Sequence, residues 1–233
     1  MSEAHYVQIG VAMTCRSFEE YVRMFDLTEH DLEAGPILDV AGGGSSFTAE
    51  ARSKGYDSYA ADPRYNGERA AWVREAKGEI EVSTAKLSAL TEKFNWSYYG
   101  SLERHRAGRE KSLKLFADHA CEVDSGSIYK DGSLPNLPYP DNRFSLIVCS
   151  HFLFLYAEQF GLDFHIAAVE ELMRITKQGG QIRIYPLLSL NWKPYSGLRK
   201  LEEIIASRGG RMELCESRLP FIPESTHYMK IIV

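Results

Sequence analysis

The sequence predicts an open α/β fold in which helices cover both faces of a largely parallel sheet. Short apolar segments typical of buried strands, such as 37–40 and 58–61, alternate with helical patterns along the chain. Segment 144–149 is continuously apolar, as expected for a central parallel strand. The glycine-rich turn 41–44 joins the first strand to a helix. With 233 residues, 44% of them hydrophobic, the chain suits one domain, 1–233.

The stretch 37–65 predicts half of a nucleotide-binding unit. After the turn, Ser45 and Ser46 are N-cap candidates for a helix that stops at Gly55, and the second strand ends on Asp62. Glycines let a ligand approach the main chain, and free N–H groups at the helix start favour a negative or electron-rich group. An acid at the second strand end can accept both hydroxyls of a ribose.

Two common nucleotide motifs fit this turn poorly. A dinucleotide fingerprint, G-x-G-x-x-G, is matched by Gly42 and Gly44, but its third glycine is replaced by Phe47. A phosphate-binding Walker loop needs a lysine, which this turn lacks. An NAD(P)-dependent oxidoreductase is therefore kept only as an alternative.

Three segments resemble the class I S-adenosylmethionine (SAM) methyltransferases. LDVAGGGS resembles their motif I, with Asp39 in its acidic position and with Ala41 and Ser45 in place of glycines. Segments 134–156 and 164–187 resemble the stretches around the fourth and fifth strands of that family. The resemblance implies a Rossmann-like, doubly wound sheet of seven strands, mostly parallel with the last strand antiparallel. It also implies SAM as the cofactor, whose cationic groups suit an acid such as Asp39.

The resemblance further implies a set of cofactor-binding residues at the ends of the first four strands. These are Asp39, Ala41, Gly42, Gly43, Asp62, Pro63, Ser133, Leu134 and Ser150. Ser133 and Leu134 would lie beside the adenine, where Asp131 is an alternative.

The candidate catalytic residue is His151, just beyond the fourth strand. Ligands of open α/β sheets bind outside the carboxyl ends of the strands. A histidine there is placed to act as a general base. The alternative is a structural histidine that hydrogen-bonds a loop.

The first 35 residues predict a helical cover over the cofactor site. Ser17 and Glu20 form a capping box that opens a helix. Arg16 and Tyr21 could then reach the cofactor carboxylate or the acceptor. Alternatively, this helix only packs on the sheet.

Residues 79–122 predict a helical insertion that acts as a lid, after a helix over 68–76. The aromatic run 94–99 suits an apolar or planar acceptor, although Trp96 could instead anchor the insertion. The basic run 103–114 predicts a solvated helix face.

The remaining elements follow in the order that the resemblance implies. They are a strand over 126–130, a helix from about His165 closed by Gly179-Gly180, a strand over 181–187, a helix capped by Ser196, and strands over 212–217 and 227–233.

Composition limits the partners of the protein. A net charge of −5 disfavours a large nucleic-acid footprint, and no apolar run approaches the roughly 20 residues of a membrane span. Four scattered cysteines and the lack of a signal-like N-terminus predict a cytoplasmic protein. The dispersed histidines predict no metal site. The oligomeric state is left open.

These observations predict a SAM-dependent methyltransferase that acts on an oxygen or nitrogen atom of a small molecule. The main alternative is a protein that binds SAM or S-adenosylhomocysteine (SAH) without catalysis.

Overall fold

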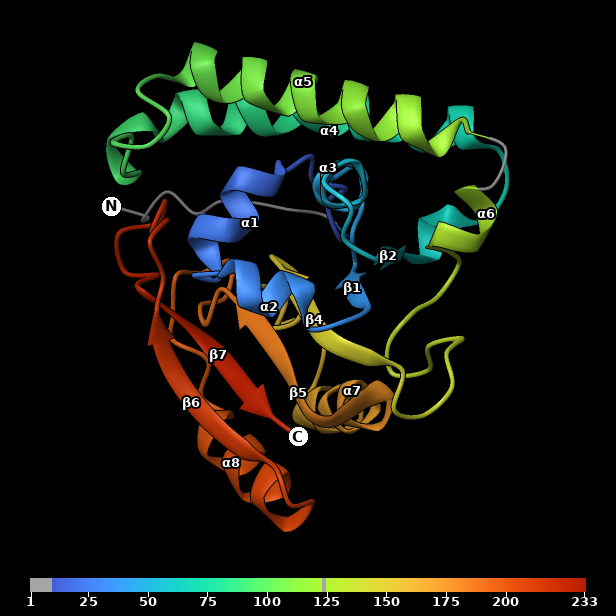
Figure 1. The fold of residues 1–233 in the computed structure, drawn as a ribbon. Helices are drawn as coiled ribbons and strands as arrows, with labels where there is room; N and C mark the ends of the chain where they lie inside the picture. Colours follow the sequence, from blue (N-terminus) through green and yellow to red (C-terminus); the bar gives the residue numbers. More distant parts are fainter. Residues whose placement is uncertain (1–9, 123–124) are drawn as a thin grey trace.

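The computed structural model describes residues 10–122 and 125–233, which form a sheet with helices on both faces (Figure 1). The helices are α1 (Phe18–Met24), α2 (Glu29–Glu33), α3 (Phe47–Ser53), α4 (Arg69–Ala89), α5 (Leu102–Ala120), α6 (Ser125–Ile128), α7 (Leu162–Ile175) and α8 (Leu198–Ser207), with short 3-10 turns at Pro63–Tyr65 and Thr91–Lys93. The strands are β1 (Ile37–Val40), β2 (Ser58–Ala61), β3 (Tyr129–Lys130), β4 (Phe144–Ser150), β5 (Thr176–Tyr185), β6 (Arg211–Glu216) and β7 (His227–Ile232).

The sheet confirms the predicted fold. Its seven strands lie in the order β3-β2-β1-β4-β5-β7-β6, and β7 runs antiparallel to both of its neighbours. β1 pairs in parallel with both β2 and β4, so the strand order reverses beside β1. Such a reversal opens a crevice at the carboxyl ends of the strands.

Each face of the sheet has its own apolar core. On one face, α7 and α8 pack on alternate residues of β4 and β5, such as Ile147 and Ile182. On the other face, α1, α2 and α3 pack on the intervening residues, such as Leu146 and Val148. The strands are therefore apolar on both sides, which explains the continuous apolar segment that predicted β4.

The helix that opens at residue 18 confirms the capping box. The Ser17 hydroxyl accepts a hydrogen bond from the Glu20 N–H, and a Glu20 carboxylate oxygen accepts one from the Ser17 N–H at 2.8 Å. This pair places α1 across the face of the sheet, with Tyr21 buried against Phe47 at a ring distance of 4.5 Å.

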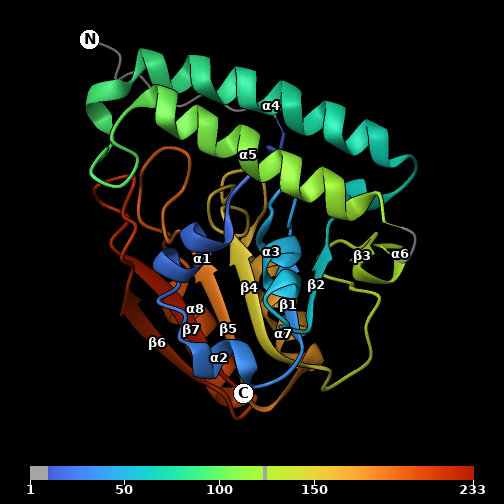
Figure 2. The same ribbon diagram turned by 45° about the horizontal axis from the view of Figure 1, so that its top comes forward.

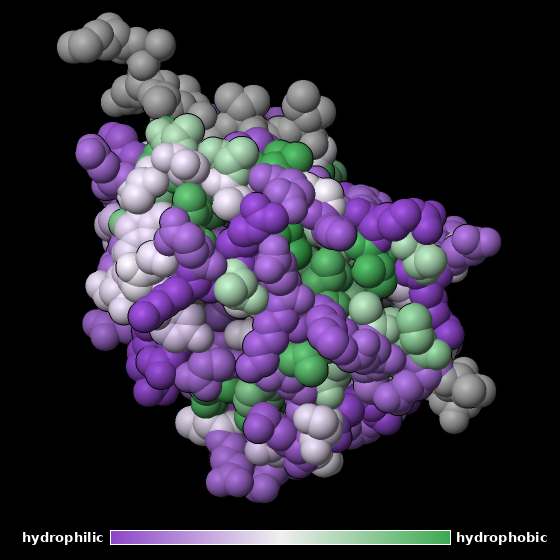
Figure 3. Space-filling view, turned by 90° about the horizontal axis from the view of Figure 1, so that it is seen from above, coloured by the Kyte–Doolittle hydropathy of each residue, from purple (hydrophilic) through white to green (hydrophobic). Residues whose placement is uncertain are grey.

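A long helical hairpin, α4 and α5, lies across the carboxyl ends of the parallel strands (Figures 1 and 2). The expected helix end near residue 76 is wrong, because α4 continues to Ala89 and the boundary at residue 79 falls inside it. Trp72, Ala76 and Ile80 are buried at four-residue intervals, so one apolar stripe holds the whole helix. Seen from above, the outer surface is mainly hydrophilic with separate hydrophobic patches (Figure 3).

Three further sequence predictions of local structure are wrong. Ser196 does not cap α8, because the N-cap residue is Gly197 and no side chain caps this helix. Residues 125–128 form the short helix α6, and only Tyr129–Lys130 pair with β2 as a strand. The pair Gly179-Gly180 does not close α7, which ends at Ile175. It lies within β5, where the register with β4 shifts. A Cβ at Gly180 would lie 2.8 Å from the Lys177 carbonyl oxygen, so the close backbone approach requires glycine there.

Among the described residues, no helix is both long enough and apolar enough to cross a membrane.

Candidate active site

The N–H groups of the glycine turn after β1 donate hydrogen bonds to neighbouring parts of the chain. The Gly43 N–H donates to Asp62 Oδ2 at 3.1 Å, the Gly44 N–H to the Thr14 carbonyl at 3.0 Å, and the Ser46 N–H to the Arg16 carbonyl at 3.0 Å. The expectation of free N–H groups is therefore wrong for these three residues and for Phe47, whose N–H donates to the Ser45 hydroxyl at 3.1 Å. The chain itself occupies the donors that a phosphate would need.

Because the glycines of this turn have no side chains, segment 12–15 can pack directly against its backbone. A Cβ added at Gly43, where φ is +55°, would lie 3.2 Å from the Thr14 carbonyl oxygen. A Cβ at Gly44 would lie 2.8 Å from the Cys15 sulfur. These glycines therefore serve the approach of the N-terminal segment to the turn.

Asp39 lies beneath the turn, away from open space. Its side chain is buried, and the Tyr21 hydroxyl lies 3.1 Å from both carboxylate oxygens. Burial raises the pKa of Asp39 well above its usual value, and the nearby Asp62 adds to the shift. Asp39 therefore contacts Tyr21, and its contact with the cationic part of a cofactor stays a prediction.

A first cavity, here named the strand-end cavity, lies at the ends of β1, β2 and β3. It is lined by Val11, Val40, Ala41, Asp62, Pro63, Arg64, Gly132, Ser133, Leu134, Phe152, Phe160 and Phe164. The structure thus brings together Ala41, Asp62, Pro63, Ser133 and Leu134 from the expected cofactor set. This lining does not include the other four expected residues, which are Asp39, Gly42, Gly43 and Ser150.

Asp62 is the buried acid of the strand-end cavity. Its Oδ1 accepts the Arg64 N–H at 2.9 Å, and its Oδ2 accepts the Gly43 N–H. Burial raises the pKa of Asp62, although these hydrogen bonds and the Arg64 guanidinium 3.8 Å away oppose the shift. Each carboxylate oxygen can accept a second hydrogen bond, which leaves capacity for two hydroxyl groups.

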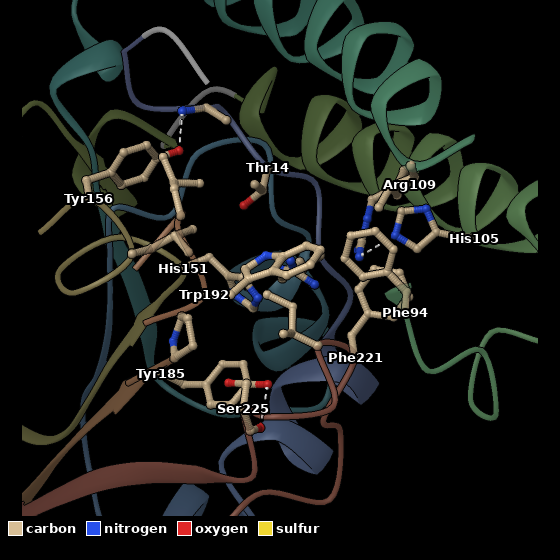
Figure 4. A pocket seen from close by; sticks show the side chains of 17 residues that line it. Thr14, Phe94, His105, Arg109, His151, Tyr156, Tyr185, Trp192, Phe221 and Ser225 are labelled. Carbon is tan, nitrogen blue, oxygen red and sulfur yellow. Dashed lines mark hydrogen bonds between the residues drawn. The ribbon is translucent and has the colours of Figure 1, made fainter. Parts of the chain in front are cut away.

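A second cavity, here named the aromatic cavity, lies beneath the helical hairpin (Figure 4). Its walls come from five separate parts of the chain and are rich in rings. They are Ala12, Thr14, Arg16, Leu87, Phe94, His105, Arg109, His151, Leu155, Tyr156, Tyr185, Pro186, Leu190, Trp192, Phe221, Ile222 and Ser225. The insertion thus supplies part of this lining, whereas Trp96 packs behind it, with its indole N–H donating to the Thr91 carbonyl.

The two cavities are neighbours. His151 lines the aromatic cavity, and the next residue, Phe152, lines the strand-end cavity. Likewise, Ala12 lines the aromatic cavity and Val11 lines the strand-end cavity. The Ala12 N–H donates to the Tyr156 hydroxyl at 2.8 Å, which fixes the N-terminal segment between the cavities.

His151 occupies this boundary in a strained conformation. Its φ is +55°, and its N–H donates to the Tyr185 carbonyl at 2.6 Å. Side chains rarely adopt this region, and such strain is concentrated at functional sites. The Ser150 hydroxyl lies 2.9 Å from Nδ1, which leaves Nε2 for another partner. Burial lowers the pKa of His151 well below its usual value, and Arg16 and Arg109 lower it further, so the ring is neutral.

A buried ionic cluster joins α1 to α5 at the edge of the aromatic cavity. Glu20 accepts a hydrogen bond from Arg109 at 2.7 Å and a longer one from Arg16 at 3.4 Å. The Tyr99 hydroxyl donates to Glu20 at 2.6 Å, and the second Arg109 nitrogen lies 3.1 Å from His105 Nε2. This cluster holds the insertion against the N-terminal helix.

The sequence analysis missed His105 and Arg109, because it assigned the run 103–114 to a solvated helix face. Both side chains are buried, together with Leu113 and Phe116. Positions 105, 109, 113 and 116 share one helix face, and this spacing was the available signal. It was obscured by the charged residues between them, Arg106, Glu110, Lys111 and Lys114.

Comparisons with known proteins place the chain in a family. No family model matches it. A curated relative, uncharacterized protein MJ0045 of Methanocaldococcus jannaschii, is 34% identical over 176 residues, which cover 75% of this chain and 77% of the relative. The chain belongs to the same family as MJ0045.

Solved structures with similar chain paths include three methyltransferases. A SAM-dependent methyltransferase from Methanosarcina mazei is 12% identical, with 88% of this chain and 96% of that chain covered and a TM-score of 0.48. One from Aquifex aeolicus is 17% identical, with 91% of each chain covered and a TM-score of 0.44. Magnesium protoporphyrin IX methyltransferase from Synechocystis, solved with bound SAM, is 9% identical, with 84% and 68% covered and a TM-score of 0.43. At these scores, the likenesses say nothing about the ligands or reaction of this chain.

Proposed function

We propose that this protein is a SAM-dependent methyltransferase that acts on an oxygen or nitrogen atom of a small molecule. The observation that carries the proposal is the pair of neighbouring cavities at the carboxyl edge of the sheet, with His151 at their boundary. One cavity suits a nucleoside, and the other suits a ring-bearing acceptor.

The residues of the strand-end cavity fit the adenosine part of SAM. Asp62 would accept the ribose hydroxyls, Ser133 and Leu134 would lie beside the adenine, and Phe152 would supply an apolar wall. The amide donors of the glycine turn are already used by the chain, which disfavours the pyrophosphate of NAD(P). When bound, SAM supplies an electrophilic methyl group.

His151 would remove the proton of the acceptor. The neutral ring of His151 has Nε2 available. An acceptor hydroxyl or amine could pass its proton to this nitrogen as the lone pair of the acceptor attacks the methyl carbon of SAM and SAH is released. The proton would then leave to water. The aromatic walls would hold the acceptor in line, and alignment of two reactants lowers the barrier by removing the entropy of encounter.

One observation favours the alternative of a protein that binds SAM or SAH without catalysis. The lowered pKa of His151 makes it a weak base, so proton removal there is inefficient. A turnover assay separates the two functions, because a binding protein forms no methylated product.

The free cysteines Cys15, Cys121, Cys149 and Cys215 support a cytoplasmic location, where thiols stay reduced.

Calorimetry tests cofactor choice directly. We expect SAM and SAH to bind and NAD to give no heat. Asp62→Ala should weaken SAM binding by about tenfold or more, since each charge-assisted hydrogen bond is worth about 1.5–3 kcal/mol. The control is Asp57→Ala, an exposed acid at the start of the same strand, which should leave SAM affinity unchanged. Binding of NAD without SAM would overturn the proposal.

A further inference from the structure

The aromatic cavity contains buried polar atoms that lack partners. Among the described residues, seven buried side-chain nitrogen or oxygen atoms have no hydrogen-bond partner. Three of these belong to residues that line this one cavity: Arg16 Nε, His105 Nδ1 and Ser225 Oγ. Folded proteins leave few such atoms unpaired, so their concentration here indicates a missing polar ligand.

The chemistry of these atoms shows what the ligand offers. Arg16 Nε can only donate. His105 Nε2 faces an Arg109 nitrogen, which can only donate, so Nε2 accepts and Nδ1 carries the proton. Two of the three atoms are therefore donors, and they call for hydrogen-bond acceptors.

The charge of the cluster points the same way. Arg16 and Arg109 both contact Glu20, so two guanidinium groups share one carboxylate. Although burial opposes it, Arg109 and Arg16 lower the pKa of Glu20 to about 2, which keeps it ionised. Burial lowers the pKa of His105 to about 2, so this ring adds no charge. One positive charge remains without a counter-charge among these groups, which an anion would balance.

The walls of the cavity indicate the rest of the ligand. Phe94 stacks on Phe221 with ring centres 4.7 Å apart, and its edge meets Trp192 at 5.9 Å. In Figure 4, Arg109 and His105 lie on one side of the view and Tyr185 on the other, with Trp192 in the middle. Rings on several sides suit a flat, aromatic molecule.

We infer that the methyl acceptor is an aromatic acid, whose ring lies in the aromatic cavity against the wall formed by Phe94, Trp192 and Phe221, and whose carboxylate faces Arg16. This inference rests on the proposed function, since it names the acceptor class of that reaction.

The wild-type protein provides the first test, with probes that differ only in charge or ring. The probes are 4-hydroxybenzoate and 6-hydroxy-2-naphthoate, the amide of each, and trans-4-hydroxycyclohexanecarboxylate. Binding is measured by calorimetry with and without saturating SAH. We expect at least one aromatic acid to bind about tenfold more tightly than its amide and than trans-4-hydroxycyclohexanecarboxylate. The amide loses charge-assisted hydrogen bonds, and the saturated acid loses the ring contacts. Equal binding of acid and amide, or binding of no aromatic acid, would overturn the inference.

Arg16→Gln provides the second test. It should abolish the preference for acid over amide, whereas Arg199→Gln, on a side chain that is 92% exposed, should keep it. If Arg16→Gln instead weakened only SAM binding and kept the preference, Arg16 would hold the cofactor, and the inference would be wrong.

The same data separate failure of the inference from failure of the proposed function. SAM binding without acid preference rejects the acceptor class alone. Acid preference without SAM binding rejects the methyltransferase and leaves a binding site for aromatic acids.

Discussion

The two cavities lie side by side but are built in different ways. Most of the lining of the strand-end cavity comes from residues at or just beyond the ends of β1, β2 and β3, such as Ala41, Asp62 and Ser133. The aromatic cavity gathers residues from Ala12 to Ser225, through the helical hairpin and three loops. Strand order therefore positions most of the first cavity, whereas the second exists only if distant segments pack together.

The largest effect should come from the ionic cluster that holds the aromatic cavity together. Glu20→Gln leaves Arg16 and Arg109 buried without a counter-charge, so we expect the free energy of unfolding to fall by about 3–5 kcal/mol. Glu19→Gln, on an exposed side chain next to it, should change it by less than about 0.5 kcal/mol. Urea denaturation measures both. If the two variants were equally stable, the cluster would not hold the hairpin.

The pH dependence of stability sharpens this point. The pKa of Glu20 is lowered from 4.5 to about 2, so the folded state binds this proton more weakly than the unfolded state. The stabilisation is therefore complete above pH 4.5 and is lost as the pH falls towards about 2. Between these values the wild type should lose its advantage over Glu20→Gln, as urea titrations at each pH would show.

The boundary between the cavities is tested by His151→Ala. We expect methyl transfer in a single turnover to slow by about a hundredfold or more, while SAM affinity stays within about threefold, because the base acts only on the acceptor. His227→Ala, an exposed histidine in β7, is the control and should transfer at the wild-type rate. A wild-type rate for His151→Ala would make this residue structural.

The sequence was informative wherever strand periodicity decided the outcome. β1 and β2 end where they were predicted, and β4 ends one residue later, at Ser150, so Asp62 and His151 lie at the sheet edge as expected. The pair Gly179-Gly180 led to a wrong helix end, because a glycine pair can either end a helix or kink a strand. Only the pairing of β5 with β4 decides that it kinks a strand here.

The aromatic cavity could be predicted only in part. Arg109 and Phe221 are far apart in the sequence, and no local pattern indicates that they line one cavity. The N–H groups expected to be free donate to Asp62, Thr14 and Arg16. Two of these three partners lie in the N-terminal segment, whose irregular backbone carries no signal in the sequence.

The smallest effect should come from the turn beside the strand-end cavity. Ala41 has a φ of +58°, a conformation that strains a side chain. Ala41→Gly should therefore raise the free energy of unfolding by up to about 1 kcal/mol. Ala49→Gly, inside α3, should lower it by about 1 kcal/mol, because glycine weakens a helix. Destabilisation by both would show that the turn is unstrained.

The central claim is that cofactor and acceptor occupy separate, adjoining cavities. A crystal structure with SAH tests it most directly. The account predicts adenosine in the strand-end cavity, with both ribose hydroxyls on Asp62, and an aromatic cavity still open beside His151. Adenosine in the aromatic cavity, or a ribose away from Asp62, would contradict it.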